Sequence, residues 1–302
     1  MTLIELQAPG VAAVIAPDLG GRVLSLRFDG AEVLWHDPAL LDDDLRPRGE
    51  PDRAPLGAGF ARWRNWGGEK TWPAPQGWDG DGWPGPPDGV LDGGPYEAIH
   101  RSDRVVHLRS AVEPATGLRI ERRMRVEPGA LEVTSTVRNE SDAPASWAAW
   151  SVAQCAFDDT DVTSDAAGIR VGVVGSADPV VLFAPIGTIG WHRAPGRIVV
   201  PFARAVGKLG FPDATGAVSL VRGDGRGVTM SFAVQGDAGY PDGAPFQLWS
   251  QTPVDGPLPG LDGLRADAAY VELEALSPRR PLEPGDHVDL VVRWSGLGRA
   301  GH

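Results

Sequence analysis

Residues 118–138 read LRIERRMRVEPGALEVTSTVR, and this stretch decides the fold. Two runs of strand-forming residues, Leu118 to Val126 and Leu131 to Arg138, flank the turn Glu127-Pro128-Gly129. Proline and glycine mark a tight turn because proline presets its own φ angle and glycine tolerates a positive one. We therefore predict two antiparallel strands joined by this turn.

The same pattern of short strands and turns extends in both directions. Upstream, residues 22–28 and 31–35 flank Asp29-Gly30, which is a typical hairpin turn. Downstream, Asn139 to Pro144 separates the second strand of the pair from another apolar run, residues 145–157. Further strands are expected at residues 104–110, 198–201, 217–222, 228–234, 246–250, 269–276 and 287–294.

This spacing of strands predicts the fold class. The 40 glycines and 28 prolines leave few stretches in which a long helix could form. Turn signals about every 8 to 12 residues are typical of antiparallel sandwiches and not of alternating strands and helices. We predict an all-β protein in which residues 1–302 form one domain of two large packed antiparallel sheets.

Charge and composition exclude several classes of function. The net charge is −12 and the isoelectric point is near 4.9, so the chain lacks the positive field that nucleic acids and anionic membranes require. The sequence shows neither a signal peptide nor a membrane-spanning run, which predicts a cytoplasmic protein. One cysteine, six scattered histidines and no nucleotide-binding motif predict that the chain uses no metal ion and no cofactor.

The most unusual segment lies between Trp63 and Trp83, which contains five of the eleven tryptophans. It includes one of only two lysines, Lys70, although the chain has 26 arginines. Aromatic rings with polar neighbours are typical of sites that hold a ring bearing hydroxyl groups. The alternative is a loop whose tryptophans cap the core and whose Glu69 and Lys70 form a solvated pair. The candidate ligand-binding residues here are Arg64, Asn65, Trp66, Glu69, Lys70, Trp72 and Gln76.

A second candidate is the run from Tyr270 to Leu276. Its period of two places Tyr270, Glu272 and Glu274 on one face of a strand. Two carboxylates on one face repel unless Arg64, Lys70 or a ligand pairs with them, and a carboxylate held in this way is a candidate general base. The alternative is that this face is solvated.

Further candidates are scattered through the chain. Trp150 and Gln154 share one face of the strand predicted at residues 145–157, where Gln154 either bonds to the core backbone or faces a wet cavity. His192 follows Trp191 in a predicted loop, and Tyr240 and Asp242 belong to a predicted turn.

The motifs in residues 65–76, 240–243 and 270–274 resemble, in this order, those of a bacterial branch of the galactose-mutarotase-like proteins, the aldose 1-epimerase superfamily. The most specific element is the run Gly67-Gly68-Glu69-Lys70-Thr71-Trp72-Pro73-Ala74-Pro75-Gln76. The resemblance covers most of the chain. It implies a β-supersandwich with a carbohydrate cleft across the concave face of the larger sheet.

The resemblance also implies a carboxylate base near the end of the chain and a histidine acid on a central strand. Glu272 or Glu274 corresponds to the carboxylate, but the central strand reads Trp150-Ser151-Val152-Ala153-Gln154 and has no histidine. Glutamine cannot exchange a proton near neutral pH as histidine does. Two hypotheses follow: a non-catalytic carbohydrate-binding protein, or an epimerase-like enzyme in which Lys70 or His192 serves as the acid.

Overall fold

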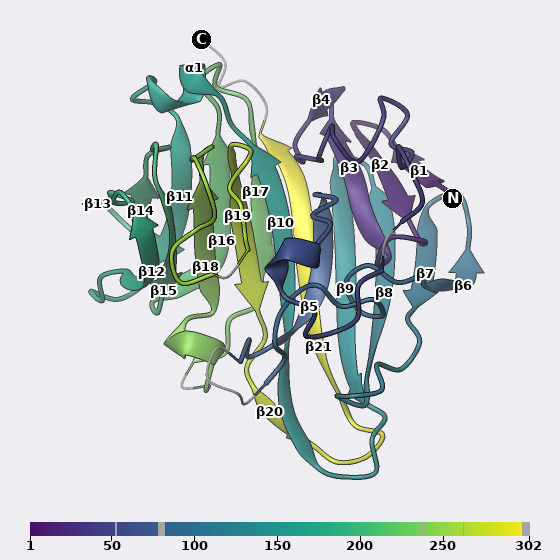
Figure 1. The fold of residues 1–302 in the computed structure, drawn as a ribbon. Helices are drawn as coiled ribbons and strands as arrows, with labels where there is room; N and C mark the ends of the chain where they lie inside the picture. Colours follow the sequence, from purple (N-terminus) through teal and green to yellow (C-terminus); the bar gives the residue numbers. More distant parts are fainter. Residues whose placement is uncertain (52, 78–81, 237, 262, 298–302) are drawn as a thin grey trace.

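The structure, a computed structural model, describes residues 1–51, 53–77, 82–236, 238–261 and 263–297. Two antiparallel sheets pack against each other (Figure 1). The first has 11 strands: β1 (Ile4–Ala8), β2 (Val11–Ala16), β3 (Arg22–Phe28), β4 (Ala31–Glu32), β5 (Glu69–Ala74), β10 (Ala145–Ala156), β12 (Val180–Ile186), β15 (Val206–Phe211), β18 (Phe246–Gln251), β19 (Tyr270–Leu276) and β20 (Arg280–Leu282). This arrangement confirms the predicted all-β sandwich.

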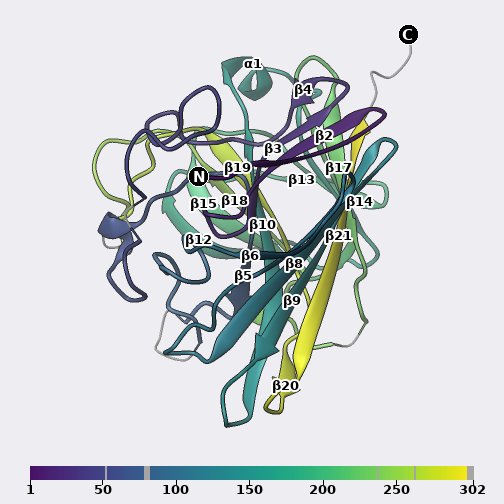
Figure 2. The same ribbon diagram turned by 90° about the vertical axis from the view of Figure 1, so that its right-hand side faces the viewer.

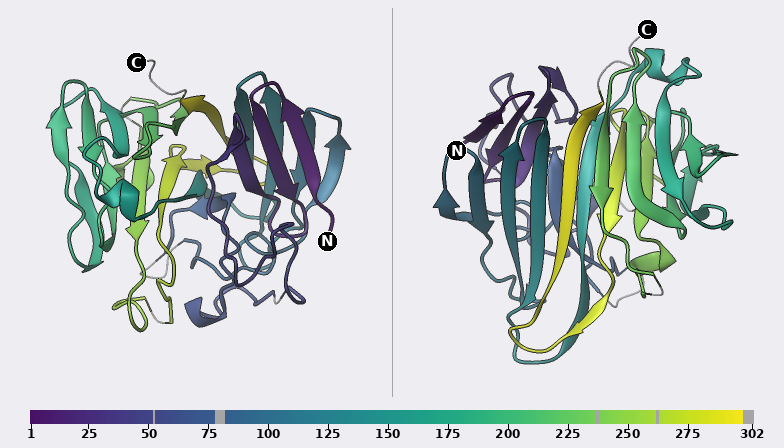
Figure 3. Two further views of the ribbon diagram at one scale, coloured as in Figure 1. Left: turned by 90° about the horizontal axis from the view of Figure 1, so that it is seen from above. Right: turned by 180° about the vertical axis from the view of Figure 1, so that it is seen from behind.

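The second sheet has ten strands: β6 (Glu97–Arg101), β7 (Val105–Arg109), β8 (Leu118–Glu127), β9 (Ala130–Asn139), β11 (Gly168–Val173), β13 (His192–Ala194), β14 (Arg197–Val200), β16 (Ala214–Val221), β17 (Gly227–Phe232) and β21 (His287–Leu297). The long strands β21, β9 and β8 lie side by side in the side view of Figure 2, and the view from behind in Figure 3 shows this sheet in front. Three short helices complete the described structure: η1 (Phe60–Arg62), α1 (Asp159–Val162) and η2 (Pro241–Gly243).

Strand order in the first sheet determines which segments meet. The order β1-β2-β3-β5-β10-β19-β18-β15-β12 places β10 at the centre, between β5 and β19. Residues of β5 and β19 are therefore separated by only one strand, although about 200 positions of sequence lie between them. The register aligns Trp72 with Trp150 on one side of β10 and Glu272 with Gln154 on the other.

The core lies between the sheets. β8 alternates strictly, so that Leu118, Ile120 and Met124 are buried while the intervening side chains point outward. Alternating residues of β9 and β21, such as Val133 and Trp294, are buried on the same side. Burial of these apolar faces, at about 25 cal/mol for each Å² removed from water, is the main force that holds the two layers together.

The predicted hairpin near the N-terminus forms only in part. Asp29 and Gly30 both have positive φ angles, as a two-residue hairpin turn requires, and β4 pairs with β3. However, β4 ends at Glu32 and not at Trp35. The chain leaves β3 at this point because Leu34 and Trp35 bond to the end of β10.

The sequence pattern predicts no strand between residues 37 and 95, and this prediction is wrong in one part. Residues 69–74 form strand β5, which is completely buried and lies near the middle of the first sheet. Gly67 and Gly68 precede it with positive φ angles and approach neighbouring backbone closely. The neighbours β10 and β3, which are distant in sequence, stabilise this short strand, so local propensity does not reveal it.

Candidate functional site

The candidate site lies on the outer face of the first sheet, which points away from the second sheet. In antiparallel sheets, residues directly opposite each other point to the same side. The register therefore forms a row across four strands, in which Gln154 pairs with Glu272, Glu272 with Trp249, and Trp249 with Lys208. Trp72 and Trp150 form a second pair on the same face.

A pocket opens on this face, beside η1. Four of its lining residues are tryptophans. The rings of Trp72 and Trp150 contact each other edge to face, with their centroids 5.2 Å apart. Glu272 is the carboxylate and Lys208 the ammonium group that line it. The lining residues are Phe60, Trp63, Trp72, Gln76, Pro86, Trp150, Phe183, Lys208, Trp249, Gln251, Leu261, Leu264, Tyr270 and Glu272. An apolar pocket with a few convergent polar groups is typical of small-molecule sites.

Glu272 is the carboxylate that a ligand in this pocket would meet. Its side chain is 10% exposed, and one of its oxygens accepts a hydrogen bond of 2.7 Å from the side-chain amide of Gln154. The ammonium nitrogen of Lys70 lies 4.0 Å from the same oxygen. Of the partners that the sequence allowed for the two glutamates, Lys70 is the one that pairs with Glu272.

Lys70 lies behind the pocket wall. Its ammonium nitrogen lies 4.8 Å from the centroid of the Trp72 ring and 6.0 Å from that of the Trp63 ring. Lys70 does not line the pocket. Its nitrogen is buried and has no hydrogen-bond acceptor among the residues that the structure describes. Burial lowers the pKa of Lys70 to about 8, although the charge of Glu272 opposes this change.

Glu274 is completely buried beside the pocket. One carboxylate oxygen accepts hydrogen bonds from the indole N–H of Trp150 at 2.8 Å and from the ammonium group of Lys208 at 2.9 Å. Burial raises the pKa of Glu274 to about 7, and the positive charge of Lys208 opposes this change. The two glutamates of β19 therefore differ: Glu272 is accessible and Glu274 is enclosed.

Lys208 was missed by the sequence analysis. It crosses over the ring of Trp150 at 4.4 Å to reach Glu274. Both lysines of the chain therefore lie on this face, each beside one glutamate of β19. The rarity of lysine, which singled out Lys70, applied equally to Lys208 and would have identified it. Of the other lining residues, Trp63 and Tyr270 belong to the two segments that the sequence analysis singled out, whereas Trp249 carried no comparable signal.

Three of the predicted site residues lie elsewhere. Glu69 points toward the second sheet, where it forms an ion pair with Arg122 of β8 and accepts a hydrogen bond from Ser151. Trp66 packs in a small apolar cluster with Leu19, Leu24 and other aliphatic residues. His192 is exposed on β13, which is an edge strand of the second sheet. Trp66 therefore matches the alternative in which a tryptophan caps the core. Glu69 matches neither prediction, because it is outside the pocket and is buried with Arg122 and not solvated with Lys70. His192 lies on the other sheet from Glu272.

The remaining predicted residues differ in their relation to the pocket. Gln76 lines both this pocket and a smaller adjoining notch, which is also lined by Asp242 and Lys208. Asn65 donates a hydrogen bond of 3.0 Å to the hydroxyl of Tyr270, and Arg64 is exposed. The Tyr240 hydroxyl accepts a hydrogen bond from the backbone of residue 235, outside the pocket lining.

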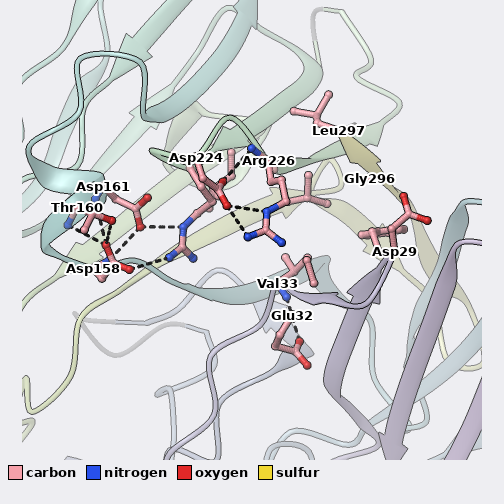
Figure 4. Close-up of a pocket in the computed structure, with 16 residues that line it drawn as sticks. Asp29, Glu32, Val33, Asp158, Thr160, Asp161, Asp224, Arg226, Gly296 and Leu297 are labelled. Atoms are coloured by element: carbon pink, nitrogen blue, oxygen red, sulfur yellow. Dashed lines mark hydrogen bonds and ion pairs between the residues drawn. The ribbon is translucent and has the colours of Figure 1, made fainter. Parts of the chain in front are cut away.

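A larger hollow, of about 560 Å³, lies at another end of the molecule, between α1 and the turns that follow β3 and β16 (Figure 4). Most of its charged groups already pair with one another or with backbone amides. Arg222 pairs with Asp161 at 2.8 Å, and Arg226 pairs with Asp224 at 2.6 Å. Glu32 accepts hydrogen bonds from backbone amides of its own turn. The outer face of the first sheet, with its incompletely bonded Lys70, is therefore the better candidate.

The described residues contain no cluster of three or more histidine, cysteine, aspartate or glutamate side chains that could hold a metal ion. In the same part of the chain, no helix is long and apolar enough to cross a membrane.

Comparison with known protein families shows to which family the chain belongs. A model described as "Domain of unknown function (DUF4380)" matches residues 1–176. The chain belongs to this DUF4380 family. The matched region contains Lys70, Trp72 and Gln154, whereas Lys208 and Glu272 lie beyond it. No curated protein matches the sequence.

Solved structures show the fold of this DUF4380 protein. A galactose mutarotase-like protein from Lactobacillus casei ATCC 334 is 13% identical, with a TM-score of 0.60 over 98% of this chain and 100% of that chain. A galactose mutarotase related enzyme from Lactobacillus acidophilus is 12% identical, with a TM-score of 0.54 over 99% and 98%. The Slr1438 protein from Synechocystis sp. PCC 6803 is 13% identical, with a TM-score of 0.59 over 98% and 95%. The chain therefore has the galactose mutarotase-like fold, as the sequence motifs implied.

Proposed function

We propose that this protein binds a sugar or sugar derivative in the tryptophan-lined pocket on the outer face of the first sheet. The observation that carries the proposal is the row in which Glu272, Trp249 and Lys208 adjoin one another across three strands, beside further indole rings. Indole faces stack on the apolar faces of a sugar ring, while carboxylate, ammonium and amide groups bond to its hydroxyls. The galactose mutarotase-like fold adds an analogy in favour of a carbohydrate.

Binding requires no catalytic acid, and the residue beside Glu272 on the central strand is Gln154. Gln154 donates a hydrogen bond to Glu272, so it holds the carboxylate in place without supplying a proton to a ligand. The indole, carboxylate, ammonium and amide groups that line the pocket are sufficient to bind a sugar. The candidate residues in contact with the ligand are Trp72, Gln76, Trp150, Trp249, Lys208 and Glu272.

A second candidate function is acid/base isomerisation of a sugar, with Glu272 as the base. The accessibility of Glu272 favours it, because a general base must reach the proton that it removes. In this candidate Lys208 replaces Lys70 and His192 as the acid, since Lys208 lines the pocket. Lys70 is shielded by the tryptophan wall, and His192 is on the other sheet.

The test is a panel of aldoses and uronic acids. We expect at least one sugar to raise the melting temperature and to show saturation transfer in ligand-observed NMR. A sugar present at 100 times its Kd stabilises the folded state by about 2.7 kcal/mol. Glu272→Gln should abolish the effect, whereas Glu97→Gln, a change to an exposed glutamate on β6, should not.

The same panel separates the two candidates. Exchange between anomers, measured by saturation transfer between their resonances, should be no faster with the protein than without it if the protein only binds. If the protein accelerates the exchange between anomers, and if Glu272→Gln and Lys208→Met each remove this acceleration, the protein is an isomerase. If no sugar in the panel binds, the proposed function is wrong.

A further inference from the structure

Asp92 is buried in the segment between β5 and β6, and two pocket tryptophans donate to it. The indole N–H of Trp63 lies 2.8 Å from one carboxylate oxygen, and the indole N–H of Trp72 lies 2.9 Å from the other. Both rings line the candidate pocket. A single carboxylate therefore receives a hydrogen bond from each of two rings that come from different elements: a loop residue and a residue of β5.

Arg22 holds this carboxylate in place. Its guanidinium group donates to Asp92 at 2.9 Å, and its side chain is fully buried on β3. The same guanidinium also donates to the backbone oxygens of Leu19, Gly67 and Asp92. The carboxylate is therefore fixed to the sheet on one side and to the two rings on the other, and such charge-assisted hydrogen bonds are among the stronger ones in proteins.

The two rings in turn surround the ammonium group of Lys70. It lies 4.8 Å from the ring of Trp72 and 6.0 Å from that of Trp63, and 4.0 Å from the carboxylate of Glu272. Trp63 is only partly buried and lies outside the strands, so its ring orientation depends on its contacts. The indole–carboxylate bond is a contact that specifies one orientation.

We propose that Asp92 is a positioning residue for the ligand pocket: it orients the rings of Trp63 and Trp72 so that they form one wall of the site in front of Lys70. This inference rests on the proposed function, because the wall is the surface on which a sugar would stack. Asp92 does not itself line the pocket. Its effect on a ligand therefore passes through the two indoles.

The chain provides a matched control in Asp88. This residue is also buried in the same segment, and it accepts a hydrogen bond of 3.0 Å from the indole N–H of Trp83. Trp83 is completely buried and does not line the pocket. Asp88→Asn therefore changes the same kind of bond at a similar depth, but at an indole that lies behind the wall, where its ring packs against that of Trp72 with centroids 5.3 Å apart.

The experiment compares Asp92→Asn and Asp88→Asn by indole NMR and by sugar affinity. Asparagine keeps one acceptor oxygen but directs an amide N–H₂ at a former donor, so at least one bond is lost. In Asp92→Asn we expect the indole N–H signals of Trp63 and Trp72 to shift and the affinity for the sugar identified above to fall about tenfold or more. In Asp88→Asn the signal of Trp83 should shift and the affinity should stay within twofold.

A third readout distinguishes positioning from general loss of structure. The negative charge of Asp92 raises the pKa of Lys70 because it stabilises the protonated form. Its removal should lower the pKa of Lys70 further, so that any pH dependence of binding moves to lower pH in Asp92→Asn but not in Asp88→Asn.

Because Asp92→Asn also weakens the pairing of buried Arg22, a second variant protects the test against failure to fold. Trp63→Phe keeps a ring but removes the donor, and we expect it to lower the affinity while Arg22 and Asp92 remain paired. Unchanged affinity in Trp63→Phe, or equal losses in Asp92→Asn and Asp88→Asn, would overturn the inference. If the wild-type protein binds no sugar, the proposed function falls, and unshifted Trp63 and Trp72 signals in Asp92→Asn would separately overturn the role of Asp92.

Discussion

Gln154 donates its side-chain amide to Glu272 across the pair of strands at the centre of the first sheet, at 2.7 Å. This contact fixes the accessible carboxylate of the pocket. Gln154 lies on the central strand, for which the family resemblance implies a histidine acid that this sequence lacks. An amide does not change its charge near neutral pH, whereas a histidine does. The contact from the central strand therefore adds no titrating group to the pocket.

Lys70 should make stability rise with pH in the alkaline range. Its pKa is about 8 in the folded protein and ordinarily 10.5, so between these values the unfolded chain binds more protons than the folded one. The free energy of unfolding then increases as the pH rises from about 8 toward 10.5. Urea unfolding at pH 7.5, 8.5 and 9.5, compared with Lys70→Met, measures this contribution. The prediction fails if the difference between the two proteins does not change with pH.

Glu274 should have the opposite effect in the acidic range. Its pKa is about 7 in the folded protein and ordinarily 4.5, so the folded chain retains the proton that the unfolded chain has lost. The contribution of Glu274 to stability is present below about pH 4.5 and is lost as the pH rises to about 7. Glu274→Gln should remove this slope. Lys208→Met should extend the window to higher pH because it removes the charge that opposes the increase in the pKa. A slope that persists in Glu274→Gln would show that another group is responsible.

The ion pair between Glu69 and Arg122 should matter for stability and not for binding. Both side chains are buried between the sheets, and Arg122 also donates to the backbone oxygen of Gly21. Arg122→Met leaves a buried carboxylate without its partner, which costs about 3–5 kcal/mol. The exposed pair of Arg109 and Glu97 is the control, since Arg109→Met should cost less than about 1 kcal/mol. Chemical denaturation measures both, and a similar cost for the two variants would contradict the prediction.

Gly68 should not tolerate a side chain. Its φ angle is +78°, and a Cβ atom would lie 2.3 Å from the backbone oxygen of Val23 on β3. Gly68→Ala should therefore destabilise the protein by about 2 kcal/mol or more. Gly129 has a similar φ angle of +71° but has no heavy atom within 4 Å of its Cβ position, so Gly129→Ala should show only the conformational cost of about 1–2 kcal/mol. Equal melting temperatures for the two variants would contradict the steric explanation.

Much of the sheet structure was predictable because it follows from local alternation and turns. β8 and β9 appear where the sequence predicts them, within one residue at each end. Their alternation of buried and exposed residues and the Pro-Gly turn between them are local patterns that can be recognised without knowledge of the fold. β5 was not predicted as a strand. Its six residues include Pro73, and it is stabilised by pairing with β10 and not by its own propensity.

The site was predictable in its parts but not in its arrangement. Rarity and composition identified Lys70, Trp72, Glu272 and Glu274, and period-two geometry placed the two glutamates on one face. Whether Glu69 or Lys70 lies on the pocket side of the first sheet depends on the register of β5 against β10, which no local pattern encodes. The role of Asp92 depends on contacts among four distant segments and left no trace in the local sequence.

Strand β5 sends alternate side chains to opposite sides of the first sheet: Glu69 and Thr71 to the second sheet, and Lys70 and Trp72 to the outer face, where Trp72 lines the ligand pocket. A deletion of one residue before it would exchange the two sets, so that an ammonium group would enter the dry interior while the interior acid turned outward. The same six residues therefore contribute both to the packing of the sheets and to the ligand pocket. Natural variants with altered ligand preference should carry substitutions in β5 but no insertion or deletion.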